Sequence, residues 1–271
     1  MAETTAADRL SRHLQEIRAK GRTALIGYLV AGDPDLTTTE MVIAAVATAG
    51  LDLLELGIPY SDPVADGPTI AAAGQRALAA GTTVEDCLEL VQHLRHLVPT
   101  ILFTYFNPVY QFGIERFAQR AAASGAWGVI IPDITVEEID EVKGPLHAHQ
   151  LAVPLLVAPT TNRARAGRIA AASDGFVYVV SRLGVTGERS GPDLDWLKDQ
   201  VEWLRQLTDK PLAVGFGISS PEQVGRVAPW ADGVIVGSAL VGSYAGHTGA
   251  AAAQLAADYV GSLIKGLARG A

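Results

Sequence analysis

Residues 24–50 read ALIGYLVAGDPDLTTTEMVIAAVATAG, in which an apolar run is followed by a turn and an alanine-rich helical pattern. The apolar run Ala24–Val30 has no strict polar alternation, which is typical of a parallel strand covered on both faces. A unit of strand, turn and helix, repeated along a chain, predicts a parallel sheet with right-handed crossovers.

The same unit recurs to the end of the chain. Seven further strands are expected at Asp52–Gly57, Thr100–Phe106, Gly128–Pro132, Ala152–Val157, Phe176–Val180, Leu212–Phe216 and Gly233–Gly237. Helices are expected at Thr37–Ala49, Val84–Leu97, Ile114–Ser124, Val136–His149, Arg163–Ala172, Asp193–Leu207, Pro221–Val227 and Gly249–Leu267, with an extra one at the N-terminus. Eight units in 271 residues favour a (βα)8 TIM barrel, an α/β fold, over an open sheet. No linker-like segment interrupts the pattern, so one domain over residues 1–271 is expected.

Composition narrows the class of protein. Hydrophobic residues make up 49% of the chain and charged residues 18%, which argues against disorder. The net charge of −8 argues against a nucleic-acid binder, which needs a basic face. Cys87 is the only cysteine, so no disulfide framework is expected. The N-terminal stretch lacks the apolar block of a signal peptide, and the longest uncharged apolar run, Met41–Leu51, is too short to cross a membrane. A cytoplasmic protein is therefore expected.

Glycines gather at the predicted ends of strands 6, 7 and 8, the face on which a barrel carries its chemistry. They are Gly187, Gly217 and Gly237, and Ser238 follows the last of them. Glycine lets backbone N–H groups approach an anion closely, and a short helical turn after Gly237 would favour phosphate. The alternative is that these are ordinary turn glycines, because the chain contains 28 of them. The arrangement indicates a phosphate site at the strand 6–8 loops.

Two carboxylates fall on the second unit. Glu55 lies inside an apolar strand, where a carboxylate is costly to bury unless it is paired or its pKa is raised. Such a group suits general acid–base catalysis near neutral pH, although a structural, water-bonded glutamate is the alternative. Asp66 lies in the loop after the same strand, and two carboxylates in different surroundings can take separate roles. Asp62 is a third candidate, or part of a turn.

Several other chemistries are disfavoured. The pairs His93 and His96, and His147 and His149, lack a carboxylate pattern typical of a metal site. Ser181 is not in a nucleophile-elbow motif, which disfavours a catalytic triad. No predicted strand contains a lysine, so a Schiff-base aldolase is not expected.

The strand-end motifs resemble those of a known family. Leu54–Pro68, LELGIPYSDPVADGP, closely resembles the signature of the tryptophan synthase α subunit family. The resemblance runs from about Leu25 to the C-terminus, and the further motifs that match in order and spacing are Gly32-Asp33-Pro34, SRLGVTG at 181–187, GFGIS at 215–219 and Gly237-Ser238-Ala239.

The resemblance implies a reaction, the retro-aldol cleavage of indole-3-glycerol phosphate to indole and glyceraldehyde 3-phosphate in tryptophan biosynthesis. By this resemblance Glu55 is the general acid–base residue, and Tyr178 lies beside it. Asp66 accepts a hydrogen bond from the indole N–H and so stabilises the indolenine tautomer. Tyr28 and Tyr105 then line the indole pocket.

The family also implies phosphate ligands, a lid and a partner. Phosphate would be bound by Gly187, Gly217, Gly237 and Ser238. The segment Arg182–Gly191 would be a mobile lid, whose Thr186 contacts Asp66 on closure. The family forms an α2β2 heterotetramer with a β subunit that carries PLP, so no cofactor is expected in this chain. The loop around Asp62 and the segment Phe106–Pro108 would lie at that interface. Leu183 in the lid, and Ile134-Thr135 after strand 4, depart from the family pattern and bear on the lid and on partner contacts.

Three alternatives remain at this point. One is another phosphate-binding barrel, such as an indole-glycerol-phosphate synthase, a phosphoribosylanthranilate isomerase or a ribulose-phosphate epimerase. Those need a strand-end lysine, a Cys–Asp pair or metal-ligating residues, which the predicted strands lack. The others are a stand-alone lyase that releases free indole, and a non-catalytic regulatory subunit.

Overall fold

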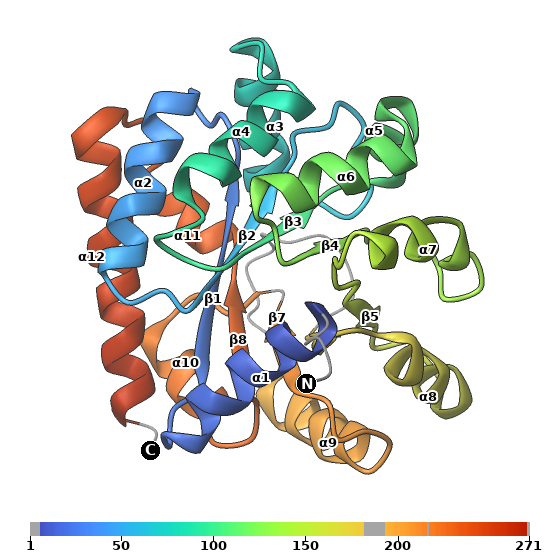
Figure 1. Cartoon of the computed structure of the whole chain (residues 1–271). Helices are drawn as coiled ribbons and strands as arrows, with labels where there is room; N and C mark the ends of the chain where they lie inside the picture. Colours follow the sequence, from blue (N-terminus) through green and yellow to red (C-terminus); the bar gives the residue numbers. More distant parts are fainter. Residues whose placement is uncertain (1–5, 182–192, 216, 270–271) are drawn as a thin grey trace.

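Eight parallel strands form one sheet. They are β1 (Ala24–Val30), β2 (Leu53–Gly57), β3 (Thr100–Phe103), β4 (Gly128–Ile130), β5 (Leu155–Val157), β6 (Val177–Val180), β7 (Leu212–Gly215) and β8 (Gly233–Val236). Their order in the sheet is β4-β3-β2-β1-β8-β7-β6-β5 (Figure 1). The computed structural model describes residues 6–181, 193–215 and 217–269.

The sheet closes on itself almost completely. Its two outermost strands, β4 and β5, approach one another at an isolated parallel bridge between Gly128 and Ala152. Because the remaining neighbours pair along their length, the eight strands form a nearly closed barrel. The predicted (βα)8 TIM barrel is thus confirmed.

Helices cover the outside of the barrel (Figure 1). They are α1 (Ala6–Ala19), α2 (Leu36–Thr48), α3 (Pro68–Ala79), α4 (Val84–Leu94), α5 (Phe106–Phe112), α6 (Ile114–Ser124), α7 (Asp140–Ala148), α8 (Arg163–Ala172), α9 (Leu194–Arg205), α10 (Pro221–Val227), α11 (Ser238–Ser243) and α12 (Gly249–Arg269). Local sequence explains several helix starts. Thr83 and Ser220 each begin a helix with a capping box, and the Asp35 side chain caps α2.

Side chains alternate between the barrel interior and the layer under the helices, as the two-residue period of a strand requires. On β1, Tyr28 belongs to the interior cluster, whereas Leu29 packs in the outer layer. On β2, Leu53 belongs to the interior cluster and Leu54 to the outer layer. Glu55 follows this alternation and therefore points into the barrel.

The extra N-terminal helix is present and belongs to the core. Leu10 and Leu14 of α1 are fully buried and pack in the interior cluster. Gly175, which precedes β6, lies so close to Leu10 that a Cβ there would overlap the leucine side chain. Helix α1 therefore covers the end of the barrel at which the strands begin.

Several strand and helix limits differ from the sequence expectation. Strand β3 ends at Phe103, and Phe106, expected at its end, instead begins α5. The Phe106 backbone N–H donates to the carboxylate of Asp133 at 2.9 Å, a tertiary contact that favours this helix start. Helix α7 begins at Asp140 rather than Val136. Helix α3 was not predicted at all, although Pro68 at its first position is a usual start signal.

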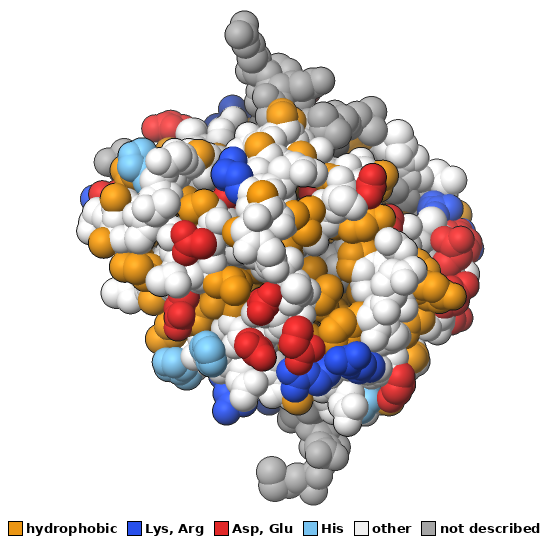
Figure 2. Space-filling model, turned by 90° about the horizontal axis from the view of Figure 1, so that it is seen from above, with side chains coloured by type: hydrophobic (Ala, Val, Ile, Leu, Met, Phe, Trp, Pro, Cys, Tyr) orange, Lys and Arg blue, Asp and Glu red, His pale blue; other side chains and the backbone are white. Residues whose placement is uncertain are grey.

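The surface carries charges of both signs. On the face drawn in Figure 2, acidic and basic side chains lie close together among hydrophobic ones, so the net charge of −8 is not gathered there into one acidic surface. Within the described ranges, none of the helices has the length and apolar character needed to cross a bilayer.

Candidate active site

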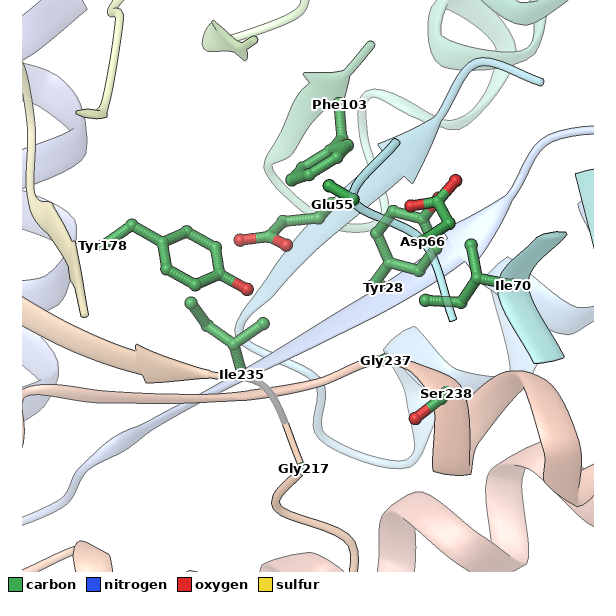
Figure 3. Close-up of a pocket in the computed structure, with 11 residues that line it drawn as sticks. Tyr28, Glu55, Asp66, Ile70, Phe103, Tyr178, Gly217, Ile235, Gly237 and Ser238 are labelled. Carbon is green, nitrogen blue, oxygen red and sulfur yellow. The ribbon is translucent and has the colours of Figure 1, made fainter. Parts of the chain in front are cut away.

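A pocket opens where the strands end and brings together residues from several distant parts of the chain (Figure 3). Its lining consists of Tyr28, Glu55, Ala65, Asp66, Ile70, Phe103, Tyr178, Gly217, Ile235, Gly237 and Ser238. Seven of the residues singled out from the sequence are among them. Ile70, Phe103 and Ile235 were not singled out, because an apolar side chain at a strand end gives no chemical signal in a sequence.

Glu55 is the buried carboxylate of this pocket. On β2 it lies opposite Tyr28 of β1 and Ile101 of β3, and its exposed fraction is 1%. Neither of its carboxylate oxygens has a hydrogen-bond partner among the described residues. Burial raises the pKa of Glu55 from its ordinary 4.5 to about 8. Glu55 therefore carries its proton near neutral pH, and its carboxyl group points toward Tyr178 (Figure 3).

The raised pKa of Glu55 predicts that the free energy of unfolding falls as the pH rises from about 4.5 to about 8. The unfolded chain ionises Glu55 from about pH 4.5, whereas the folded chain keeps the proton until about pH 8. Between these values the unfolded state binds fewer protons than the folded state, so the free energy of unfolding falls as pH rises. The fall is on the order of a few kcal/mol. We expect Glu55→Gln to lack this pH-dependent loss. The Tm of the variant minus the Tm of the parent should therefore increase from pH 5 to pH 8. A Tm difference independent of pH would contradict the burial cost.

Asp66 lies in the loop between β2 and α3 and is held by a tyrosine. The hydroxyl group of Tyr105 donates a hydrogen bond to the Asp66 carboxylate and accepts one from the Ala65 backbone N–H at 3.1 Å. Burial raises the pKa of Asp66, and the bond from Tyr105 opposes that rise. Tyr105 is thus close to the predicted site, although it supports Asp66 and does not line the pocket. The bond favours an ionised Asp66.

Two interior tyrosines fit against strand glycines. The Tyr28 hydroxyl lies against Gly57 of β2, where a Cβ would overlap it, and a Cβ at Gly215 would lie 2.5 Å from the Tyr178 hydroxyl. Both tyrosines are buried, which raises the pKa of each phenol, and the Glu55 charge raises it further. Gly57 and Gly215 were quoted within motifs but given no role. Their backbones make room for the rings beside Glu55.

The candidate phosphate residues lie together at another part of the pocket. Gly217, Gly237 and Ser238 line it, at the ends of β7 and β8 (Figure 3). Gly217 has a φ of +93°, a conformation that side-chain-bearing residues rarely adopt. Thr186, Gly187, Leu183 and the rest of the predicted lid, Arg182–Gly191, lie outside the described residues.

The remaining candidates lie away from the pocket. Ile134 and Thr135 follow β4 and border a separate cavity between β4 and β5. Asp62 lies in the exposed part of the β2–α3 loop. No group of three or more His, Cys, Asp or Glu side chains suited to a metal ion occurs in the part of the chain that the structure describes.

The chain matches known proteins over most of its length. The family model described as tryptophan synthase alpha chain matches residues 14–263. The tryptophan synthase alpha chain of Prochlorococcus marinus (strain MIT 9313) is 48% identical over 261 residues, which cover 95% of this chain and 93% of that protein. That of Methanosarcina mazei is 49% identical over 235 residues, covering 86% and 85%.

Solved structures agree with this match. Mycobacterium tuberculosis tryptophan synthase in space group F222 contains a chain that superposes with a TM-score of 0.88 at 37% identity, covering 96% of this chain and 98% of that one. The alpha subunit of tryptophan synthase from Legionella pneumophila str. Paris gives a TM-score of 0.87 at 34% identity, covering 98% and 99%. With the motif-bearing pocket, these matches lead to one conclusion: the chain belongs to the tryptophan synthase alpha chain family.

Proposed function

We propose that this pocket performs the family's reaction, the retro-aldol cleavage of indole-3-glycerol phosphate to indole and glyceraldehyde 3-phosphate. The observation that carries the proposal is Glu55, a carboxylic acid buried in the pocket with no hydrogen-bond partner among the described residues. Leaving such a group unpaired costs stability, and a cost of this kind is retained where the group acts on a substrate. A non-catalytic regulatory subunit would have no use for it.

Glu55 is the general acid–base residue of the proposed mechanism. It first helps to protonate the indole carbon that leaves, and it then removes the proton from the glyceryl hydroxyl next to the ring while the carbon–carbon bond breaks. The aldehyde forms from that hydroxyl, and no other reactant is consumed. A pKa of about 8 keeps both protonation states of Glu55 accessible near neutral pH, which acid–base catalysis needs.

Asp66 stabilises the charge that develops on the ring. When the indole carbon is protonated, the ring becomes a positively charged indolenine, and its N–H donates to the Asp66 carboxylate. The hydrogen bond from Tyr105 fixes that carboxylate before the substrate arrives. A fixed, ionised group stabilises developing charge without reorganising during the reaction.

The rest of the pocket supplies binding. Tyr28 and Phe103, whose rings meet edge to face with centroids 5.5 Å apart, would lie against the indole ring, together with Ile70 and Ile235. Gly217, Gly237 and Ser238 would bind the phosphate group. In this proposal Gly187 is a further phosphate ligand, and Thr186 contacts Asp66.

A PLP-carrying β subunit is the proposed partner, in an α2β2 assembly. Tyr60 accepts a hydrogen bond from the Asn107 side-chain amide at 3.2 Å and so joins the Asp62 loop to α5. On these two segments Val64 is 75% exposed and Tyr110 is 61% exposed. Large apolar side chains that stay exposed on two joined segments support an interface at this surface. In this proposal PLP belongs to the partner, as the family resemblance implies. The proposed location is the cytoplasm.

The test is indole release from indole-3-glycerol phosphate by the purified chain, with and without an added tryptophan synthase β subunit. We expect slow release by the chain alone and a large rise when the β subunit is added, because closure of the site depends on the partner. Fast release by the chain alone would instead indicate a stand-alone lyase. No release under either condition would overturn the proposed function and favour the regulatory-subunit alternative.

A further inference from the structure

A half-buried ion pair joins the β1–α2 loop to α3. Arg76 of α3 donates from Nε to Oδ1 of Asp33 at 2.7 Å and from Nη2 to Oδ2 at 3.0 Å. The Asp33 side chain is only 1% exposed, whereas that of Arg76 is 39% exposed. Neither residue lines the pocket. The pair therefore has no direct part in substrate chemistry.

The geometry of this pair fixes the two side chains firmly. A guanidinium bonded through two parallel N–H groups fixes direction as well as distance, which a single bond does not. The Asp33 backbone is itself held, because its N–H donates to the Val30 carbonyl at 3.3 Å and its carbonyl accepts from the Thr39 hydroxyl at 3.4 Å. The carboxylate that receives Arg76 is thus anchored to the end of β1.

A second contact anchors α3 to the same loop. Gly32, with a φ of +82°, lies directly against the Thr82 side chain, three residues after α3 ends. A Cβ at Gly32 would overlap the threonine. Helix α3 is therefore held to the β1–α2 loop near its C-terminal end, at Arg76 and just beyond it.

The other end of α3 carries a proposed catalytic group. Asp66 precedes the helix by one residue, Gly67, and Ile70 in the first turn lines the pocket (Figure 3). A helix rises 1.5 Å per residue, so Arg76 lies about 12 Å along the axis from Pro68. Because a helix is stiff over this length, a shift or rotation at Arg76 moves Asp66 relative to Glu55 on β2.

We propose that the Asp33–Arg76 pair is a positioning element that, through helix α3, holds Asp66 in its position relative to Glu55. This inference rests on the role proposed above for Asp66. Asp33 and Arg76 are positioning residues and not catalytic ones, because they act through α3.

The first test compares Arg76→Met with a matched control. Arg22 makes the same two-bond contact to a mostly buried aspartate, Asp52, whose side chain is 10% exposed, at the end of the barrel where the strands begin. Arg22→Met therefore removes equivalent chemistry away from the pocket. A misplacement of about 1 Å can cost about 100-fold in rate. At a temperature where both variants are folded, we expect Arg76→Met to lower kcat by about tenfold to 100-fold with a smaller change in KM, and Arg22→Met to leave both unchanged.

A double-mutant cycle separates positioning from general loss of stability. If Arg76 acts through Asp66, then Asp66→Asn should cost about 100-fold in kcat in the parent and in Arg22→Met, but less than about tenfold in Arg76→Met. Equal costs in all three backgrounds would overturn the proposal, as would an Arg76→Met variant with a lowered Tm and an unchanged kcat.

A conservative variant keeps the test decisive if Arg76→Met fails to fold. Arg76→Lys retains the charge but cannot form the two parallel bonds, so we expect kcat between those of the parent and the tenfold loss, with Tm close to the parent's. An Arg76→Lys variant with the parent's kcat and full sensitivity to Asp66→Asn would overturn the proposal. If Asp66→Asn leaves the rate of the parent unchanged, the proposed role of Asp66 is wrong. That comparison uses proteins with Arg76 intact, so it is independent of the Arg76 variants.

Discussion

Replacement of Glu55 by glutamine is expected to lower kcat for indole-3-glycerol phosphate cleavage by about 10²- to 10⁴-fold while the barrel still folds. Glutamine has nearly the same shape but cannot donate a proton to the indole carbon or accept the hydroxyl proton. Folding should not suffer, because Glu55, with a pKa of about 8, is already uncharged near neutral pH. The measurement is steady-state indole release, with circular dichroism and Tm as the check on folding.

A matched control isolates the effect of position. Glu85→Gln makes the same chemical change on α4, where the Glu85 side chain pairs with Arg120 outside the pocket. This variant is expected to keep the parent's kcat and KM. Near-parental turnover in Glu55→Gln would refute the acid–base role.

Replacement of Asp66 by asparagine is expected to lower kcat by about 10²- to 10³-fold, with a much smaller change in KM. The amide has no charge with which to stabilise the indolenine, and only its oxygen can accept a hydrogen bond, whereas both carboxylate oxygens of aspartate can. The residues at the ends of β7 and β8 that we propose bind phosphate remain in place, so substrate binding should persist. Steady-state kinetics give the two constants separately.

The control for charge alone is Asp258→Asn on α12, which removes an exposed carboxylate that does not line the pocket. It should behave as the parent does. An Asp66→Asn variant with raised KM and unchanged kcat would show that Asp66 binds the ground state as strongly as the transition state and does not act on the developing charge.

The barrel could be predicted from sequence because each strand has a recognisable local pattern of residues. Continuous Val, Ile and Leu runs such as Ala24–Val30 are the mark of parallel strands, and the structure confirms that strand with the expected limits. The position of Glu55 could be predicted for the same reason, because a carboxylate inside such a run breaks a strong pattern. The pocket then followed from the rule that barrel chemistry lies at the strand ends.

What could not be predicted depends on contacts between distant residues. Helix α3 follows a loop rich in Pro, Asp and Gly, and its position is set by Asp33, 43 residues before Arg76. The hydrogen bond from Tyr105 to Asp66 likewise joins two separate units of the barrel. No local sequence pattern predicts either contact. Gly32-Asp33-Pro34 was noticed as a motif, but its partner on α3 became visible only in three dimensions.

The most direct test of the account is a parallel measurement of indole and glyceraldehyde 3-phosphate formation by the parent chain and by Glu55→Gln, both with added β subunit. The account predicts that the parent forms the two products in equal amounts from indole-3-glycerol phosphate and that the variant, although folded, forms them at least 100-fold more slowly. Equal rates from the two proteins would contradict the claim that the buried carboxyl group of Glu55 performs the cleavage.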